Sequence, residues 1–116
     1  MANPVWDGVV TYLTFVTTST NSFNVPAGSG AITIIMPSLT TDTTAALEGL
    51  SPIDKTTWTA VKALDVVAGS AAADAIVLTE SEYVVIPASA IGCGTFRLTC
   101  ANTQAGQIAQ VIIDRI

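Results

Sequence analysis

Histidine is absent from this chain of 116 residues, and several kinds of catalytic and metal site depend on it. Without an imidazole the chain lacks the commonest general base, the Ser-His and Cys-His nucleophile pairs, and the most versatile metal ligand. The two cysteines do not make a zinc site by themselves. We therefore expect no catalytic residue, no metal site and no cofactor, and we expect that the protein is not an enzyme. A small hydrolase on a β-scaffold is the least favoured hypothesis.

Basic residues and long apolar runs are also scarce. Lys55, Lys62, Arg97 and Arg115 are the only basic residues, and with nine acidic residues they give a net charge of −5. No window of ten residues holds a basic cluster that could neutralise a row of phosphates, so we expect no binding to nucleic acid. The apolar stretches are far shorter than the about 18 to 20 residues that cross a bilayer. The start "MANPVWDG" has no basic region before an apolar run, so we expect no signal peptide and no membrane span, and synthesis and folding in a host cytoplasm.

Charged residues make up only 11% of the chain, well below the about 25% typical of soluble domains, whereas half of the chain is hydrophobic. This composition leaves the surface to Thr, Ser, Asn, Gln and Ala, which suits a protein that packs against others. The length fits one domain with one core. We expect an N-terminal arm, residues 1–8, followed by one β-sandwich domain, residues 9–116.

Alternation with a period of two residues is the main structural signal. In "TFRLTC", Phe96, Leu98 and Cys100 fall on one face, which predicts a half-buried strand. In "QIAQVIIDRI", Ala109, Val111 and Ile113 can point inward while Ile112 and Asp114 point outward, so this strand carries apolar residues on both faces. In "GVVTYLTFVTT", Val9, Leu13 and Phe15 fall on one side, and Val10, Tyr12 and Val16 fall on the other.

Turn residues divide the rest of the chain into further short strands. The "PAGSG" turn separates "FNV" from a strand over 31–36 that Pro37 ends. We predict strands at 44–50, 56–67, 75–80 and 83–88, with "AGSAAADA" as a flexible loop; a short helix within 59–67 is the alternative. Many short strands without a long helix predict an all-β fold, an antiparallel β-sandwich or jelly-roll-like single domain, with a closed barrel as the second choice.

The two cysteines are predicted to be free thiols. Seven residues at about 3.3 Å each place Cys93 and Cys100 roughly 23 Å apart along a strand, whereas a disulfide needs α-carbons closer than about 7 Å. Cys100 shares a face with Phe96 and Leu98, so we expect it to be a small core residue. Cys93 lies in the "GCG" bend.

Other polar and aromatic residues give weaker signals. Glu80 and Glu82 are the best-spaced pair of carboxylates, and we interpret them as solvated charges at a strand edge rather than as a hydrolytic pair. Asp42 stands among threonines, so a calcium ion there would need ligands from distant loops. Trp58 is expected to pack in the core or against a sheet; the alternative is a stacking platform for a sugar or a base.

The N-terminal arm is the candidate for partner contact. It contains Pro4, Val5 and Trp6, and an exposed arm that carries a tryptophan needs either this domain or a neighbouring chain to pack on. We therefore assign these three residues a partner-contact role.

Four segments in order, "VPAGSGAITI", "TTWTAVKALD", "YVVIPASAIGCGTFRLTC" and "NTQAGQIAQVII", resemble small virion proteins of tailed bacteriophages. The similarity covers roughly residues 23 to 114 and consists of residue types rather than a diagnostic motif. It implies a β-sandwich that decorates a capsid or forms part of a tail, without an enzymatic role. By the same resemblance, Trp58 and Arg97 are expected to have framework roles. Residues 1–22 do not match the pattern, so the arm is where we expect the features specific to this protein.

These observations lead to a hypothesis of function and an alternative. The leading hypothesis is a capsid decoration (cement) protein of the virion that binds the major capsid protein and reinforces the assembled head. We expect a homo-oligomer, because the last strand carries apolar residues on both faces and only 11% of the residues are charged. We specifically expect a trimer, because trimers fit the local three-fold positions of an icosahedral shell. The alternative is a carbohydrate- or receptor-binding jelly-roll module of a phage fibre or tail, which would require exposed aromatic residues and a groove.

Overall fold

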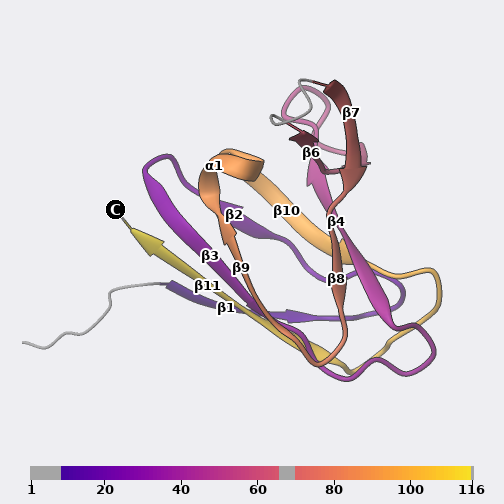
Figure 1. Ribbon diagram of the computed structural model, residues 1–116. Coiled ribbons are helices and arrows are strands. Elements are labelled where there is room, and N and C mark those ends of the chain that lie inside the picture. Colours follow the sequence, from indigo (N-terminus) through magenta and orange to yellow (C-terminus); the bar gives the residue numbers. More distant parts are fainter. Residues whose placement is uncertain (1–8, 66–69, 116) are drawn as a thin grey trace, which may run out of the picture.

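The computed structural model describes residues 9–65 and 70–115, which form two antiparallel β-sheets packed face to face (Figure 1). The first sheet has, in spatial order, β1 (Val9–Thr14), β11 (Ile108–Arg115), β3 (Ser29–Ile35) and β9 (Tyr83–Pro87). The second sheet has β2 (Phe23–Val25), β10 (Gly94–Thr99), β4 (Thr44–Leu50) and β5 (Trp58–Ala60), with β8 (Val77–Thr79) also paired to β4. The predicted all-β sandwich is therefore confirmed.

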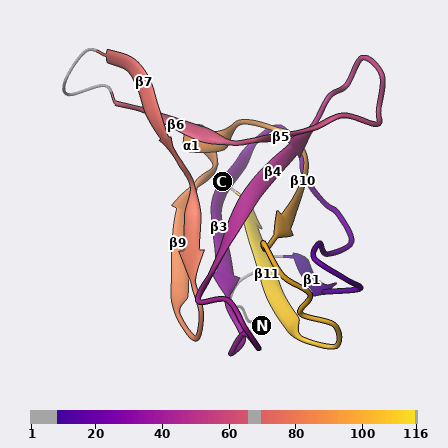
Figure 2. The same cartoon turned by 90° about the vertical axis from the view of Figure 1, so that its right-hand side faces the viewer.

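Two smaller elements accompany the sheets. A separate hairpin of β6 (Lys62–Asp65) and β7 (Ser70–Ala75) extends beyond one end of the sandwich (Figure 2). A single helical turn, α1 (Ala88–Ile91), follows β9. It ends at Gly92, whose N–H donates to the carbonyl of Ala88 at 2.8 Å and whose φ of 77° lies in the left-handed region that favours glycine.

The strand register explains which side chains enter the core. On β1, Leu13 pairs with Ala109 of β11, and both side chains are fully buried. Their neighbours Tyr12 and Gln110 also pair, and both are exposed on the opposite face. The alternation predicted from the sequence for these two strands is confirmed, and the same holds for β10.

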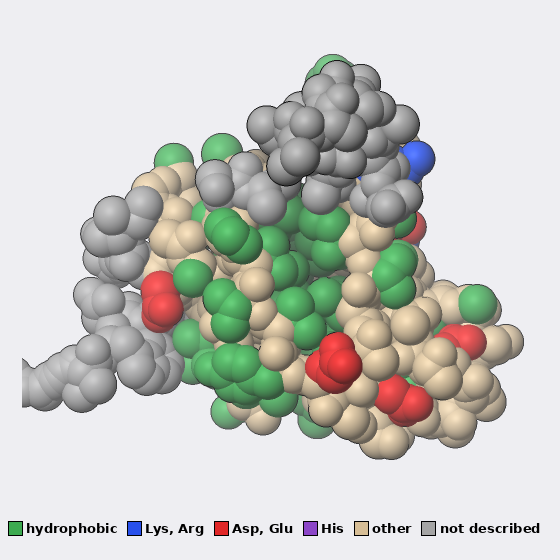
Figure 3. Space-filling view, viewed as in Figure 1, with side chains coloured by type: hydrophobic (Ala, Val, Ile, Leu, Met, Phe, Trp, Pro, Cys, Tyr) green, Lys and Arg blue, Asp and Glu red, His purple; other side chains and the backbone are tan. Residues whose placement is uncertain are grey.

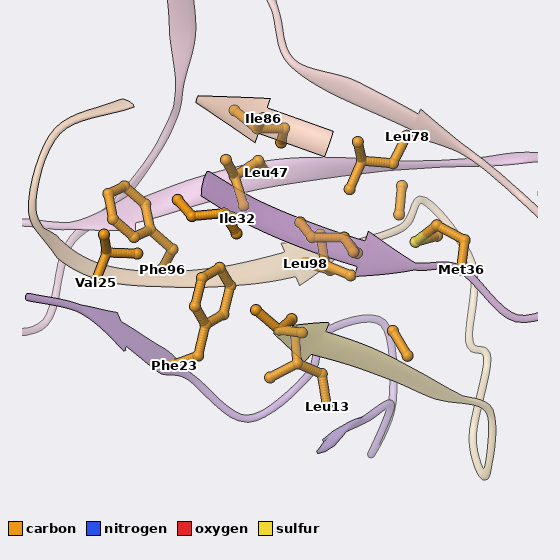
Figure 4. Close-up of a cluster of buried hydrophobic side chains, with 14 of the residues drawn as sticks. Leu13, Phe23, Val25, Ile32, Met36, Leu47, Leu78, Ile86, Phe96 and Leu98 are labelled. Carbon is orange, nitrogen blue, oxygen red and sulfur yellow. The ribbon is translucent and has the colours of Figure 1, made fainter. Parts of the chain in front are cut away.

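The core is a layer of aliphatic and aromatic side chains between the sheets (Figure 4). Phe23 of β2 and Phe96 of β10 pack with their ring centroids 5.9 Å apart in a tilted arrangement. Ile32 and Ile34 of β3 are fully buried, as is Leu47 of β4. Contacts between these groups remove apolar surface from water. Each Å² buried in this way stabilises the fold by about 25 cal/mol, and this burial is the main contribution to the stability of such a fold.

The middle of the chain differs from the prediction in two respects. Residues 56–67 were predicted to form one strand, but β5 ends at Ala60 and β6 begins at Lys62. Val61 lies at the junction: its N–H donates to the carbonyl of Leu47 at 2.9 Å, and its carbonyl accepts from Ile76 at 2.9 Å. The chain therefore changes pairing partner there, and no helix forms within residues 59–65.

The loop predicted for "AGSAAADA" is wrong for residues 70–75, which form β7 and pair with β6. Small residues provide little alternation for a sequence argument, and here the partner strand determines the conformation. The helical turn α1 was also not predicted. Among the described residues, no helix has the length and hydropathy needed to span a membrane.

Candidate functional site

The arm residues Pro4, Val5 and Trp6 lie outside the described residues, so their partner-contact role remains a prediction. The first described strand, β1, begins at Val9. The described surface contains a second candidate site, and the elements of the second sheet build it.

An aromatic side chain and an ion pair meet on the outer face of the second sheet. Arg97 of β10 lies directly opposite Glu48 of β4, and the Arg97 Nε donates to the Glu48 Oε1 at 2.9 Å. Trp58 of β5 pairs with Leu50, which lies two residues after Glu48 and therefore on the same face of β4. The guanidinium carbon of Arg97 lies 4.3 Å from the centroid of the Trp58 ring. Three adjacent strands thus place a cation between a carboxylate and an indole.

This cluster is partly open to solvent. The side chains of Arg97 and Glu48 are 26% and 20% exposed, and Trp58 is half-buried. A cation over an indole ring contributes about 0.5–1 kcal/mol at an exposed site, and a surface ion pair contributes a similar amount or less. The cluster therefore holds Trp58 against the sheet, as predicted for a sheet-packing residue, and leaves donors and acceptors beside an aromatic ring.

A pocket of about 340 Å³ continues this face. It is formed between the β4–β5 connection and the bend that precedes β10. Leu50 and Thr95 line the pocket and also belong to the outer face of the second sheet, and Lys55 and Cys93 contribute a cation and a thiol. The remaining lining residues are Ser51, Pro52 and Gly94.

The β4–β5 connection forms one wall of this pocket, and hydrogen bonds to Asp54 fix its conformation. Its carboxylate accepts from the N–H groups of Thr56 and Thr57 at 2.9 and 3.0 Å, and also from the Thr57 hydroxyl. These bonds, that of the Thr56 N–H foremost, lower the pKa of Asp54 to about 2. Lys55 has a φ of 60°, and its N–H donates to the carbonyl of Ser51 at 3.0 Å. This turn presents Lys55 to the pocket.

Asp42 has an anchoring role in the structure. Its carboxylate accepts from the N–H and the side-chain amide of Asn102 at 2.8 and 2.9 Å, and from the Gln104 amide at 3.0 Å. The Asn102 N–H is the main reason that the pKa of Asp42 is lowered. Within residues 9–65 and 70–115, no cluster of three or more His, Cys, Asp or Glu side chains is placed to hold a metal ion.

Gln104 is a structural residue that sequence reasoning missed. Its side chain is fully buried and binds the connection between β3 and β4, more than 60 residues away in sequence. The connections β3–β4 and β10–β11 both pass from one sheet to the other, so Gln104 ties two inter-sheet crossings together. The only sequence signal was a glutamine within a turn-like stretch.

The prediction for the two cysteines is confirmed. Both are free; Cys93 is exposed in the bend and Cys100 is buried directly after β10. The Cys100 Sγ donates to the carbonyl of Thr44 at 3.6 Å. Burial, together with the charge of Asp42, raises the pKa of Cys100 to about 11, so this thiol stays protonated near neutral pH.

The pair Glu80 and Glu82 does not converge on a shared cleft in the described structure. Glu80 is half-buried and accepts from the N–H of Leu39 at 2.9 Å, so it caps the chain near the β3–β4 connection. Glu82 is exposed, as expected for a solvated edge charge.

No protein-family model and no curated protein matches this sequence. Among solved structures, the chain is similar to the SPBc2 prophage-derived protein YomS, with a TM-score of 0.60 and 8% sequence identity. The similarity covers 98% of this chain and 99% of that chain. At this identity the similarity shows a shared fold, and it extends over the whole sandwich.

Proposed function

We propose that the protein is a structural protein of a bacteriophage virion, a capsid decoration protein that binds the major capsid protein on the assembled head and reinforces it. The observation that carries the proposal is the fold shared with a prophage-derived protein over 98% of this chain. The low content of charge and the β-sandwich support a protein whose role is to make contacts. In this proposal the protein acts without catalysis or a cofactor.

Attachment to the shell is assigned to the N-terminal arm. An extended segment can add a strand to an exposed sheet edge of a partner, with main-chain hydrogen bonds for affinity and a side chain in a pocket for specificity. Pro4 favours an extended chain, and Trp6 is the side chain with the largest surface to bury. A tryptophan at the centre of an interface contributes about 2 kcal/mol or more. We further propose that the protein binds the shell as a trimer, because a trimer matches local three-fold positions.

Co-sedimentation with undecorated phage heads tests this function. The full chain should bind saturably and raise the temperature at which the heads rupture, whereas chains lacking residues 1–7 or carrying Trp6→Ala should bind at least about thirtyfold more weakly, as the loss of about 2 kcal/mol requires. Ile53→Ala is the matched control, because Ile53 is 92% exposed on the β4–β5 connection. Absence of binding by the full chain would reject the decoration role. Unchanged binding without the arm would reject only the attachment segment.

A second candidate function is a carbohydrate- or receptor-binding module of a fibre or tail. The specific observation in its favour is the cluster of Trp58, Arg97 and Glu48 beside the 340 Å³ pocket. Sugar-binding surfaces combine an aromatic platform with charged hydrogen-bonding groups in this way. Binding of host surface polysaccharide that Trp58→Ala abolishes, with Val16→Ala unchanged, would favour this function; Val16 is 70% exposed and does not line the pocket. Equal binding by both variants would exclude the cluster as the site.

A further inference from the structure

The outer face of the first sheet is apolar, in contrast to the outer face of the second sheet. Its residues come from all four strands, and we call the following set the apolar face: Val10, Tyr12, Ile35, Tyr83, Val85 and Ile112. The pairs Val10 with Ile112 and Ile35 with Tyr83 are direct cross-strand neighbours. Two uncharged polar residues, Gln110 and Thr33, lie between them in the same two rows. Tyr12, Tyr83 and Val85 are 61%, 67% and 57% exposed. Hydrophobic side chains are also plentiful on the neighbouring surface around β8 and β9 (Figure 3).

We propose that the apolar face is a self-association surface on which a second copy of this chain docks in the free protein, forming a face-to-face pair that is separate from the trimer proposed on the shell. Face-to-face packing of sheets is the standard way to bury such a surface, and the sandwich already uses it on the inner face of the same sheet. Monomeric proteins seldom expose a continuous apolar patch larger than a few hundred Å². Patches of about this size often have a function, and three features of the structure point to another copy as the occupant.

The first feature is charge. Asp114 is the only charged residue among those described on this face. Together with Ile112 it lines a hollow at the margin of the face. A strongly charged partner would find almost nothing to pair with here, whereas a second copy presents the same nearly uncharged surface. Two apolar faces bury each other without leaving unpaired charges at the centre.

The second feature is shape. A hollow of about 150 Å³ lies in the face, between Thr33, Tyr83, Ile112 and Asp114. At about 30 Å³ per molecule it has room for about five waters, or for the ring end of an aromatic side chain. Tyr12 projects from the same face. One face thus carries both a projecting ring and a hollow that can receive one, as a self-complementary surface requires.

The third feature is the edge of β1, which is blocked to strand addition near its end. The N–H of Thr14 donates to the Asn21 Oδ1 at 2.8 Å, and the Asn21 Nδ2 donates to the carbonyl of Tyr12 at 3.2 Å. The Asn21 amide therefore occupies the positions that a neighbouring strand would use. Copies cannot extend the sheet at this point, so we infer that they meet through the face.

The size of the face sets the expected strength of association. Four strands about 4.8 Å apart, each about six residues long at about 3.3 Å per residue, give a face of roughly 400 Å². Two copies then bury roughly 800 Å², below the about 1,200–2,000 Å² of stable complexes. We therefore expect reversible, concentration-dependent association with a Kd between about 10 µM and 1 mM, the range of weak interfaces.

Sedimentation of the free, full chain tests the proposal. The mass of the wild-type protein should rise above the monomer mass of 11.9 kDa as its concentration rises from about 1 µM to 1 mM. Val85→Lys, which places a charge on the face directly beside Thr33, should weaken association at least about thirtyfold. Ile53→Lys is the matched control, because Ile53 is 92% exposed on the β4–β5 connection of the second sheet; it should associate as the wild type does.

Three results would overturn the proposal. They are a wild-type chain that stays monomeric at 1 mM, a folded Val85→Lys chain that associates like the wild type, and a monomeric full chain that begins to associate once residues 1–7 are deleted. The last result would mean that the arm covers the face. If Val85→Lys fails to fold in a thermal unfolding assay, Tyr12→Lys on β1 provides the same test. Because only free protein is used, the outcome is independent of whether the protein binds phage heads.

Discussion

Replacing Gln104 by alanine removes a buried side chain that joins the two crossings between the sheets. Its Oε1 accepts from the N–H of Thr40, and its Nε2 donates to the Thr41 hydroxyl at 3.1 Å, to the Asp42 carboxylate at 3.0 Å and to the carbonyl of Asn102 at 3.3 Å. Each full bond contributes about 0.5–1.5 kcal/mol net, and because the amide has two hydrogens for three acceptors the side chain makes at most three full bonds, worth up to about 4.5 kcal/mol. This sum is an upper value, because water can reach some partners after the change.

The exposure of the groups that bind Gln104 sets the lower value of the expected loss of stability. Thr40, Thr41 and Asn102 are exposed, and Asp42 keeps its two bonds to Asn102. We therefore expect Gln104→Ala to lower the free energy of unfolding by about 2–4 kcal/mol. At about 4 °C per kcal/mol for a domain of this size, the Tm should fall by about 8–16 °C.

Urea denaturation and calorimetry measure this change directly. Gln110→Ala is the control, because Gln110 is exposed on β11 and its loss should change the stability by less than about 0.5 kcal/mol. The reasoning is refuted if Gln104→Ala unfolds at the same urea concentration as Gln110→Ala. Unchanged m-values in both variants are needed for the comparison, since they show that the same surface is exposed on unfolding.

Three further predictions concern other parts of the molecule. In a thiol-labelling assay near pH 8, Cys93 should react quickly and Cys100 only after unfolding, because Cys93 is exposed while Cys100 is buried with its pKa raised to about 11; equal rates in the folded protein would contradict this. Because the pKa of Asp54 is lowered to about 2, its contribution to stability is present above pH 3.8 and is lost as the pH falls toward 2. Asp54→Asn should therefore flatten the acid limb of a plot of Tm against pH. An unchanged limb would contradict the stabilising role assigned to the ionised Asp54. Arg97→Ala should cost about 1–2 kcal/mol, and a double-mutant cycle with Trp58→Ala should give a coupling of about 0.5–1 kcal/mol in urea denaturation; zero coupling would mean that the cation and the ring do not interact.

The sequence was informative wherever one face of a strand is buried. Burial imposes a period of two, so Phe96, Leu98 and Cys100 could be assigned to the core from their spacing, and so could Leu13 and Phe15. The same argument indicated that the last described strand is apolar on both faces. That observation predicted self-association, and the structure adds which surface would carry it.

Features that depend on pairing between distant strands could not be predicted. The partners of Gln104 lie more than 60 residues away, and nothing in "NTQAG" indicates them. Arg97 meets Glu48 and Trp58 only because of the register of β10, β4 and β5. A strand of small residues such as β7 has no alternation to detect, so its hairpin partner determines its structure.

The position of β11 has a consequence for synthesis of the protein on the ribosome. β11 is the last described strand, yet it lies between β1 and β3, with Val9 opposite Ile113. Until residues 108–115 have left the ribosome, β1 has no neighbour in its sheet, and the inner faces of both strands stay in water. The nascent chain therefore has to keep the apolar residues of β1 available until β11 has been made. Pairings of such long sequence separation form slowly, so we expect recovery of native protein to depend on chaperones and on the rate of translation.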